Sequence, residues 1–245
     1  MIKKPYPFIF TNDANYSTLQ NTTGSLISAT VYGGKLHYYP HFFTHTQSDE
    51  YLDYFLENSL GYWKSIQWKD HTNHQHIKAS FSHINWRQEH VTLFGKTHPL
   101  PRLTAWYGDT NAIYRYSGIT SHPHPWDKQL FLIKQQIEQT AHYAFNSVLM
   151  NWYRDGSDTV GWHADNESSL GKQPVIASIS LGETRDFILR KNTDPSDHIL
   201  IALEHGSLLL MTGGIQQHWQ HSIPKRKNCN QSRINLTFRK IIQQA

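Results

Sequence analysis

The sequence predicts an α+β protein, mainly β, whose core is a double-stranded β-helix (jelly-roll) over residues 147–242. Short apolar segments separated by turn residues follow one another through this region, which is the pattern of an antiparallel double-sheet barrel. Eight such segments lie within about a hundred residues: Val148–Tyr153, Thr159–His163, Val175–Leu181, Asp186–Arg190, Ile199–Leu203, Ser207–Met211, His221–Ile223 and Ile234–Ile242.

Segments before this core predict two flanking helices and further strands. Ser48–Asn58 opens with a serine and two acidic residues and then spaces its apolar residues as a helix does, so we expect a short capped helix. Trp126–Phe145 repeats apolar residues every three or four positions behind two prolines, which predicts a longer helix packed on a sheet. Leu26–Tyr32 and Lys35–Tyr39 are typical of short strands.

The composition indicates one domain without disulfides. A β-rich domain of 245 residues is ordinary, so we expect residues 1–245 to form a single domain and the protein to be a monomer. The net charge of +4 permits a polyanionic partner without requiring one. The single cysteine, Cys229, excludes a disulfide scaffold and a cysteine-based metal site, so that any metal must be held by His, Asp or Glu.

The sequence gives no sign of export or of a membrane span. The longest apolar stretches fall far short of the roughly 20 residues that a spanning helix needs. The N-terminal apolar run is too short for a secretory signal and has no small-residue cleavage site. We therefore expect no membrane partner and an intracellular location, cytoplasmic, or nuclear if the source is eukaryotic.

His163 and Asp165 form the one His-x-Asp pattern in the chain. With 17 histidines and 19 carboxylates, chance alone gives about 1.3 His-x-Asp/Glu pairs, so the pattern depends on its context. Residues two apart on a strand point to the same face, which lets an imidazole and a carboxylate converge on one ion. A third ligand must come from another strand, and His205, His218 and His221 are candidates that could each equally be an ordinary histidine. His221 is favoured because it opens a strand-like segment.

Two histidines and one carboxylate on one side of an ion are the facial triad of non-haem iron(II). This set leaves three of the six octahedral positions open. A bidentate 2-oxo acid can fill two of them and dioxygen the third, which a closed four-ligand structural site does not allow.

The segment Arg233–Arg239 alternates polar and apolar residues throughout. Arg233, Asn235, Thr237 and Arg239 share one face, which is rich in hydrogen-bond donors and suits a buried anion. The alternative is an exposed edge strand with solvated arginines. At strand spacing the two arginines lie about 20 Å apart, too far to grip one carboxylate together, so they serve different ends of a ligand or its surroundings.

Taken together, these motifs resemble the AlkB family of iron(II)- and 2-oxoglutarate-dependent nucleic-acid dealkylases. The resemblance covers residues 80–242, and its combined spacing is far more specific than any single motif. The segments that carry it are Asn151–Tyr153, Asp155–Gly156, His163–Asp165, Ser178–Gly182, His205–Gly206, Trp219–His221 and Arg233–Arg239.

The resemblance implies roles for the residues of the core. His163, Asp165 and His221 would be the iron ligands and the catalytic centre. The residues expected around 2-oxoglutarate are Asn151, Tyr153, Arg233, Asn235, Thr237 and Arg239. Arg233 is assigned to the distal carboxylate of 2-oxoglutarate and Arg239 to the end nearer the metal.

The resemblance also divides the rest of the chain. Residues 1–80 would be an N-terminal extension with short strands and a helix, and residues 81–146 a nucleotide-recognition lid with its supporting helix. The residues expected to contact substrate are Phe94, Arg102, Tyr107, Tyr114, Tyr116 and Glu167. Without the resemblance, Tyr116 reads as a core aromatic, Glu167 as a solvated loop carboxylate and Arg102 as a surface charge.

Details of the lid favour different branches of the family. Leu93–Lys96 resembles the hairpin of duplex-acting members, in which an apolar residue enters the gap left by a flipped base. Arg102–Tyr107 and Trp219 instead resemble members that prefer single strands. Asn166 departs from relatives that have an acid there, which puts the choice of lesion in doubt.

The resemblance implies an enzyme that oxidatively demethylates 1-methyladenine and 3-methylcytosine in DNA, single- or double-stranded, using Fe(II), 2-oxoglutarate and O₂ and releasing formaldehyde and succinate. Arg190, Lys191 and Lys225–Lys227 would meet phosphates, although such a charge run is usually a solvated loop. The alternatives are an RNA demethylase or tRNA-modifying enzyme, a protein or lipid hydroxylase of the same fold, and a non-catalytic nucleic-acid binding module. The intact triad counts against the binding module.

Overall fold

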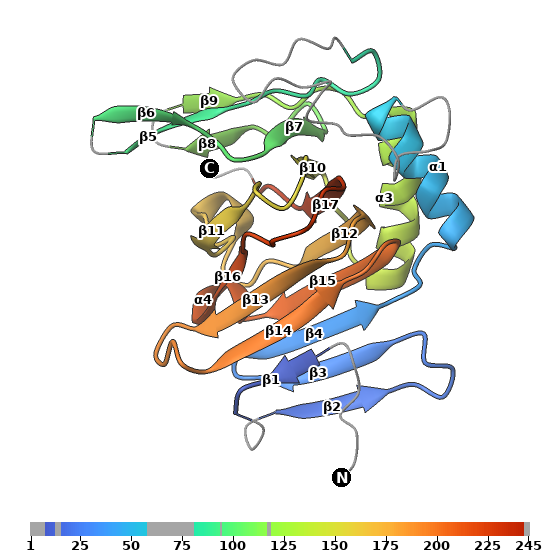
Figure 1. Cartoon of the computed structure of the whole chain (residues 1–245), viewed down its shortest axis with the longest axis vertical. Coiled ribbons are helices and arrows are strands. Elements are labelled where there is room, and N and C mark those ends of the chain that lie inside the picture. The colour runs from blue at the N-terminus through green and yellow to red at the C-terminus, as the bar shows by residue number, and fades with distance from the viewer. Residues whose placement is uncertain (1–7, 13–15, 58–80, 94, 117–118, 243–245) are drawn as a thin grey trace.

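The computed structural model describes residues 8–12, 16–57, 81–93, 95–116 and 119–242. Two antiparallel sheets face each other (Figure 1). The larger sheet has the order β2 (Ser17–Gln20), β3 (Ile27–Val31), β4 (Gly34–Tyr39), β15 (Ser207–Gly213), β12 (Ile176–Gly182), β17 (Arg233–Arg239), β10 (Ser147–Tyr153), β7 (Leu103–Gly108). The smaller sheet has the order β1 (Phe8–Phe10), β14 (His198–Leu203), β13 (Arg185–Lys191), β16 (Trp219–Ile223), β11 (Val160–His163).

All eight strands predicted after residue 147 are present, with ends that differ by a few residues from the expected ones. The two predicted strands near residues 26–39 are also confirmed, as β3 and β4. The double-sheet core is therefore the predicted jelly-roll. Two small hairpins lie at one end of it, at the top of Figure 1: β5 (His90–Leu93) with β6 (Lys96–Pro99), and β8 (Tyr114–Tyr116) with β9 (Ile119–Ser121).

Two long helices, α1 (His45–Leu56) and α3 (Lys128–Ala141), cover the larger sheet on one side. α1 begins at His45 rather than at the predicted Ser48, because Thr44 and Gln47 form a reciprocal capping box. Ser48 lies inside the helix, where its hydroxyl donates to the Thr44 carbonyl at 2.8 Å. α3 is shorter than predicted at both ends, since the Asp127 carboxylate caps its first turn and His142 takes the left-handed conformation that ends it.

Two short helical segments complete the described secondary structure, the 3₁₀ turn η2 (Ser168–Leu170) and α4 (Ile215–His218). Among the described residues, none of the helices combines the length and the apolar character needed to cross a bilayer.

The alternation of β17 places its two faces in different environments. Its apolar residues Ile234, Leu236 and Phe238 pack toward α1 and α3 in one hydrophobic cluster. Its polar residues face the space between the two sheets, where a second cluster contains Leu189 and Leu209. All seven residues of β17 are buried, and β10 and β12 flank the strand on both sides. β17 is therefore a central strand, which excludes the alternative of an exposed edge.

Candidate active site

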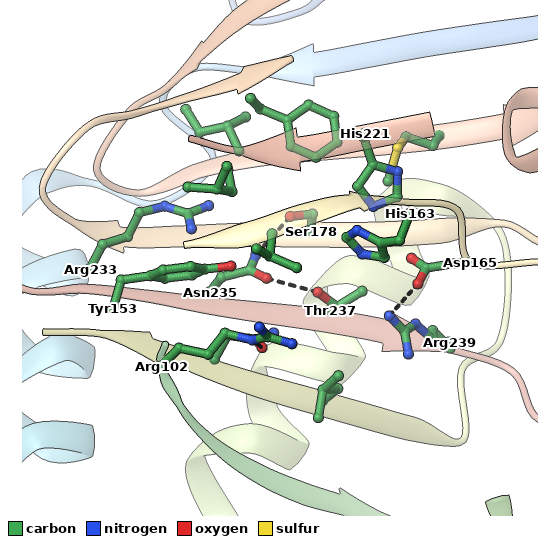
Figure 2. Close-up of a pocket in the computed structure, with 17 residues that line it drawn as sticks. Arg102, Tyr153, His163, Asp165, Ser178, His221, Arg233, Asn235, Thr237 and Arg239 are labelled. Atoms are coloured by element: carbon green, nitrogen blue, oxygen red, sulfur yellow. Dashed lines mark hydrogen bonds and ion pairs between the residues drawn. The ribbon is translucent and has the colours of Figure 1, made fainter. Parts of the chain in front are cut away.

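A cavity between the two sheets gathers most of the residues predicted to hold the metal and the co-substrate (Figure 2). Figure 2 shows Arg233 and Tyr153 at one end of it and His163, Asp165 and Arg239 at the other. The lining residues are Arg102, Leu149, Asn151, Tyr153, Val160, His163, Asp165, Ser178, Phe187, Leu203, Met211, His221, Ile223, Arg233, Asn235, Thr237 and Arg239.

His163, Asp165 and His221 form a cluster whose ligand atoms all lie within 4.8 Å of one another. His163 ends β11 and lies opposite His221 on the neighbouring strand β16, so the two imidazole centroids are 4.2 Å apart. The register of this pairing shifts between Val160 and His163, a bulge-like irregularity of the kind that re-aims a side chain. Asp165 follows just beyond the strand end. The structure thus selects His221 from the three candidate histidines.

Hydrogen bonds and burial prepare both imidazoles for a cation. Nδ1 of His163 lies 2.8 Å from the carbonyl of Gly161, which can only accept, so Nδ1 carries the proton and Nε2 keeps its lone pair. His221 is 5% exposed, and burial followed by the nearby His163 lowers the pKa of His221 to about 3. His221 is therefore neutral at physiological pH. Its Nδ1 is buried without a hydrogen-bond partner among the described residues.

Asp165 is held from two directions. Nη2 of Arg239 donates to its Oδ1 at 2.6 Å, and its backbone N–H donates to Oε1 of Gln216 at 2.9 Å. Burial alone would raise the pKa of Asp165, but Arg239, His221 and His163 together lower it below its ordinary value. The carboxylate is therefore ionised and fixed in position.

Arg233 is a buried cation with donors to spare. It is 1% exposed, its Nη2 donates to Oγ of Ser180 at 2.9 Å, and its Cζ lies 5.2 Å from the ring centroid of Tyr153. Its Nε and Nη1 find no partner within the described ranges. Burial lowers the pKa of Arg233 to about 10, so the guanidinium stays charged at neutral pH. A buried charge with unsatisfied donors favours an anion, and its planar fork matches a carboxylate.

Between the two ends, polar side chains of neighbouring strands hold one another in place. Nδ2 of Asn235 donates to Oγ of Ser178 at 2.8 Å, and Oγ1 of Thr237 donates to Oδ1 of Asn235 at 2.8 Å. Nε of Arg102 donates to Oδ1 of Asn151 at 2.8 Å. These bonds make a preorganised polar wall between Arg233 and the His-Asp-His cluster.

The residues present fit a metal with an organic anion beside it. Two imidazoles and one ionised carboxylate bring their ligand atoms together, and two histidines with one carboxylate are the ligand set of non-haem iron(II) with open positions. The orphaned donors of Arg233 supply a counterpart for a carboxylate at the other end of the same cavity.

Comparison with known proteins decides the family. The chain matches the 2OG-Fe(II) oxygenase superfamily over residues 35–239. The chain belongs to this superfamily. Within it, the similarity of this chain to curated proteins identifies the AlkB family. It is 45% identical over 167 residues to the mouse alpha-ketoglutarate-dependent dioxygenase alkB homolog 3, covering 64% of this chain and 58% of that protein.

Two further comparisons agree. The chain is 39% identical over 175 residues to the human DNA oxidative demethylase ALKBH2, covering 69% of this chain and 67% of that protein. The solved structure of OsALKBH1 superposes with a TM-score of 0.55 at 17% identity, covering 86% of this chain and 98% of that one, which supports the fold. The chain spans a little under three fifths of the length of the alkB homolog 3 proteins that it matches.

The predicted substrate residues lie in several places. Arg102 lines the cavity itself, where it contacts Asn151. Glu167 immediately precedes η2, two residues beyond Asp165. Tyr114 and Tyr116 are the first and last residues of strand β8. The expectation for Phe94 lies outside the described residues.

Tyr107 requires a correction, because its side chain lies in the core rather than in the cavity. It is 6% exposed, belongs to the cluster beneath the helices, and its hydroxyl accepts from the backbone N–H of Asn85 at 2.9 Å. Nearly every residue of β7 is buried, so the alternation that separates a core face from a site face is missing there.

Gln216 is a site residue that sequence reasoning misses. It is 1% exposed on α4, and besides accepting from the backbone of Asp165 its Nε2 lies 3.5 Å from Sδ of Met211. Phe187, also missed, stacks on His221 with ring centroids 5.0 Å apart. No sequence pattern points to either, because each contact joins segments that are distant along the chain.

A second cluster, His45, Asp49 and His205, also brings three possible ligand atoms within 4.8 Å. Here Nδ1 of His205 accepts from the backbone N–H of Gly182 at 2.8 Å, so the proton of a neutral His205 is on Nε2, which donates to Asp49 at 3.1 Å. A protonated nitrogen cannot bind a cation. This cluster is therefore a hydrogen-bond network that ties α1 to the core.

Proposed function

We propose that this chain is an Fe(II)- and 2-oxoglutarate-dependent dioxygenase that demethylates N-alkylated bases, such as 1-methyladenine and 3-methylcytosine, in DNA. The observation that carries the proposal is the shared cavity, in which the unsatisfied guanidinium of Arg233 faces the same space as the His-Asp-His cluster. The names of the mouse and human relatives supply the co-substrate and the DNA substrate class. A monomeric state and an intracellular location are further parts of the proposal.

In this proposal His163, Asp165 and His221 hold the iron, and Arg233 binds the distal carboxylate of 2-oxoglutarate. When bound, Fe(II) with 2-oxoglutarate and O₂ supplies the oxidation of an N-methyl group to a hydroxymethyl group, which leaves as formaldehyde while succinate and CO₂ are released. Asn151, Tyr153, Asn235 and Thr237 complete the polar surroundings of the co-substrate.

The protein contributes placement and exclusion of water. Arg239 and Gln216 fix the orientation of Asp165, so the ligand set is arranged before any ion arrives. Apolar residues close the cavity around the ligands, among them Phe187, which stacks on His221. A dry wall beside the reacting group strengthens its interactions with fixed charges and restricts side reactions.

The base must leave its stack to reach this cavity, and the two hairpins β5–β6 and β8–β9 are proposed to receive it. Tyr116 would stack on the extruded base, Tyr114 would also contact the substrate, and Arg102 and Glu167 would contact polar edges of the base. The positions of Arg102 in the cavity and of Glu167 just beyond Asp165 support this arrangement.

The experiment is a mass-spectrometric assay of methylated single- and double-stranded DNA, with methylated RNA alongside, in the presence of Fe(II) and 2-oxoglutarate. We expect loss of the methyl group from DNA with equivalent release of succinate and formaldehyde. Asp165→Asn should abolish turnover and weaken Co(II) binding, whereas Asp194→Asn, which changes an exposed carboxylate, should do neither. Faster turnover of RNA would assign the enzyme to RNA, and succinate release without demethylation of any nucleic acid would contradict the proposal.

A further inference from the structure

The edge strand of the smaller sheet carries an exposed aromatic residue beside the metal cluster. Trp162 is 41% exposed and immediately precedes His163 on β11. Val160 and His163 line the cavity, whereas Trp162 does not. The indole therefore lies outside the cavity, one residue from a ligand of the proposed iron. An exposed indole at this position calls for an explanation that core packing does not give.

A fixed arginine lies against this indole. Cζ of Arg190 is 4.3 Å from the ring centroid of Trp162. Nε and Nη2 of Arg190 both donate to Oε1 of Gln220, at 3.0 and 2.7 Å. Nη1 has no acceptor in the part of the chain that the structure describes, so the guanidinium is held in place while one of its amino groups is left to bind an outside acceptor.

A second pair of the same kind continues this surface. Nζ of Lys191 lies 4.5 Å from the ring centroid of Tyr32, which is 54% exposed. A surface groove of about 230 Å³ runs beside the two cations and is lined by Arg190, Lys191, Asn192, Pro195 and Gln220. We call Tyr32, Trp162, Arg190, Lys191 and Gln220 the β11–β13 surface.

We propose that the β11–β13 surface binds the single strand that flanks the target nucleotide, with one base stacked on the Trp162–Arg190 pair and phosphates at Arg190 and Lys191. The inference rests on the proposed function and extends it from the target base to its neighbours. Aromatic faces combined with a basic groove are what sequence-tolerant single-strand binding requires, because every base has a flat face and every linkage a negative charge.

Position along the chain supports this occupant over a separate protein partner. Trp162 and His163 point to opposite faces of β11, but β11 is the edge strand of the smaller sheet, so a strand whose methylated base reaches the metal cluster has only to pass over this edge to meet the indole. The exposed acidic residue of this region, Asp194, lies in the turn after β13, where it accepts from Ser196 at 2.6 Å. The hydrogen bonds from Ser196 and, after them, the charge of Lys191 lower the pKa of Asp194, so Lys191 also acts on this carboxylate, but none of the described residues that line the groove is acidic.

The test compares binding of a long and a short substrate to the protein loaded with Fe(II) and 2-oxoglutarate under anaerobic conditions. A methylated trinucleotide reaches only the cavity, whereas a longer single-stranded oligonucleotide also reaches the β11–β13 surface. Trp162→Leu should weaken binding of the longer strand about tenfold, with unchanged affinity for the trinucleotide and for 2-oxoglutarate. Arg190→Gln should reduce the slope of log K against log salt for the longer strand by about 0.7.

A matched control exists on the other side of the molecule. Phe131 on α3 is 42% exposed and has Nζ of Lys134 at 5.5 Å from its ring centroid, so it is also an aromatic–cation pair at the surface. Phe131→Leu should leave binding of both substrates unchanged. An equal effect of Phe131→Leu and Trp162→Leu would mean that exposed aromatics bind the strand nonspecifically and would overturn the assignment.

The outcomes separate the two proposals. If wild-type protein demethylates the trinucleotide but Trp162→Leu binds the longer strand normally, the surface assignment fails and the function stands. If no nucleic acid is demethylated yet strand binding depends on Trp162, the function fails and the surface stands. Equal loss of trinucleotide and longer-strand binding would make Trp162 a support for His163. A loss confined to duplex DNA would assign the surface to the opposite strand, which contradicts the proposal.

Discussion

Nη2 of Arg239 donates to Oδ1 of Asp165 across 2.6 Å, and both side chains are buried. The two residues come from different parts of the cavity wall: Arg239 ends β17, and Asp165 follows β11. Burial alone would raise the pKa of Asp165, but Arg239 is the largest of the influences that lower it, so the pKa stays below its ordinary value despite burial. The Asp165 carboxylate, the proposed iron ligand, is thus charged and correctly oriented before a metal binds.

Gln216 should act as a positioning residue for the same carboxylate. Gln216→Leu removes the acceptor of the Asp165 backbone N–H, and loss of an outer partner of a ligand typically weakens metal binding ten- to a hundredfold. Calorimetric titration with Co(II) measures this, with Gln217→Leu on the same helix as the control. Normal metal affinity with a lowered melting temperature would show that Gln216 serves stability alone.

Arg233→Lys should raise the KM for 2-oxoglutarate at least tenfold, by roughly the free energy of one charge-assisted hydrogen bond, while the KM for DNA changes little. Addition of 2-oxoglutarate should also raise the melting temperature of the wild type more than that of the variant. Arg185→Lys is the control, because Arg185 is equally buried but donates to backbone carbonyls of Asp155, Asp158 and Pro224. An unchanged KM for 2-oxoglutarate in Arg233→Lys would remove Arg233 from the site.

Tyr107→Phe should destabilise the protein without affecting substrate binding. The change removes the acceptor of the backbone N–H of Asn85, and because Asn85 is exposed the cost is that of an ordinary hydrogen bond, about 0.5 to 1.5 kcal/mol of unfolding free energy. Denaturant unfolding measures the cost, and the KM for methylated DNA should match the wild type. Tyr116→Leu should do the reverse, raising that KM with unfolding unchanged. A raised KM in Tyr107→Phe would return Tyr107 to the substrate residues.

Phe94→Ala tests the expectation that an apolar residue between β5 and β6 fills the gap left by an extruded base in duplex DNA. Unstacking costs a few kcal/mol that a single strand has largely avoided. Demethylation of duplexes should slow by ten- to a hundredfold, about 1.4 to 2.7 kcal/mol, with single-strand rates nearly intact. Equal slowing on both substrates together with a fallen melting temperature would identify Phe94 as a core residue instead.

The strands, and the face of β17 that lines the cavity, can be predicted from the sequence because side chains alternate between the two faces of a strand. Arg233, Asn235 and Thr237 could be placed together on that ground alone, and the structure buries all three in the cavity wall. The choice of His221 over His205 needed only the expectation of a strand at that point, since pairing with β11 then brings it opposite His163.

Contacts between segments far apart in the chain could not be predicted, because no repeating sequence pattern encodes them. Gln216 meets Asp165 across 51 positions of chain, and no local pattern encodes that approach. In the sequence, Tyr107 cannot be distinguished from a tyrosine that faces the substrate. Only the burial of both faces of β7 in the structure assigns it to the core. The start of α1 differs because Thr44 and Gln47 cap each other's backbone N–H groups, which lets the helix begin one turn before Ser48.

The central place of β17 bears on which changes of chain length the protein can survive. The strand forms hydrogen-bonded ladders on both sides, with β10 and with β12, so an inserted or deleted residue cannot be absorbed by a shift at a free edge. One added residue would turn the arginines toward the helices and the leucine toward the anion site. A single deletion in β17 should therefore abolish folding and activity together. The turn between β13 and β14 should accept extra residues, because an insertion there changes only the surface loop itself.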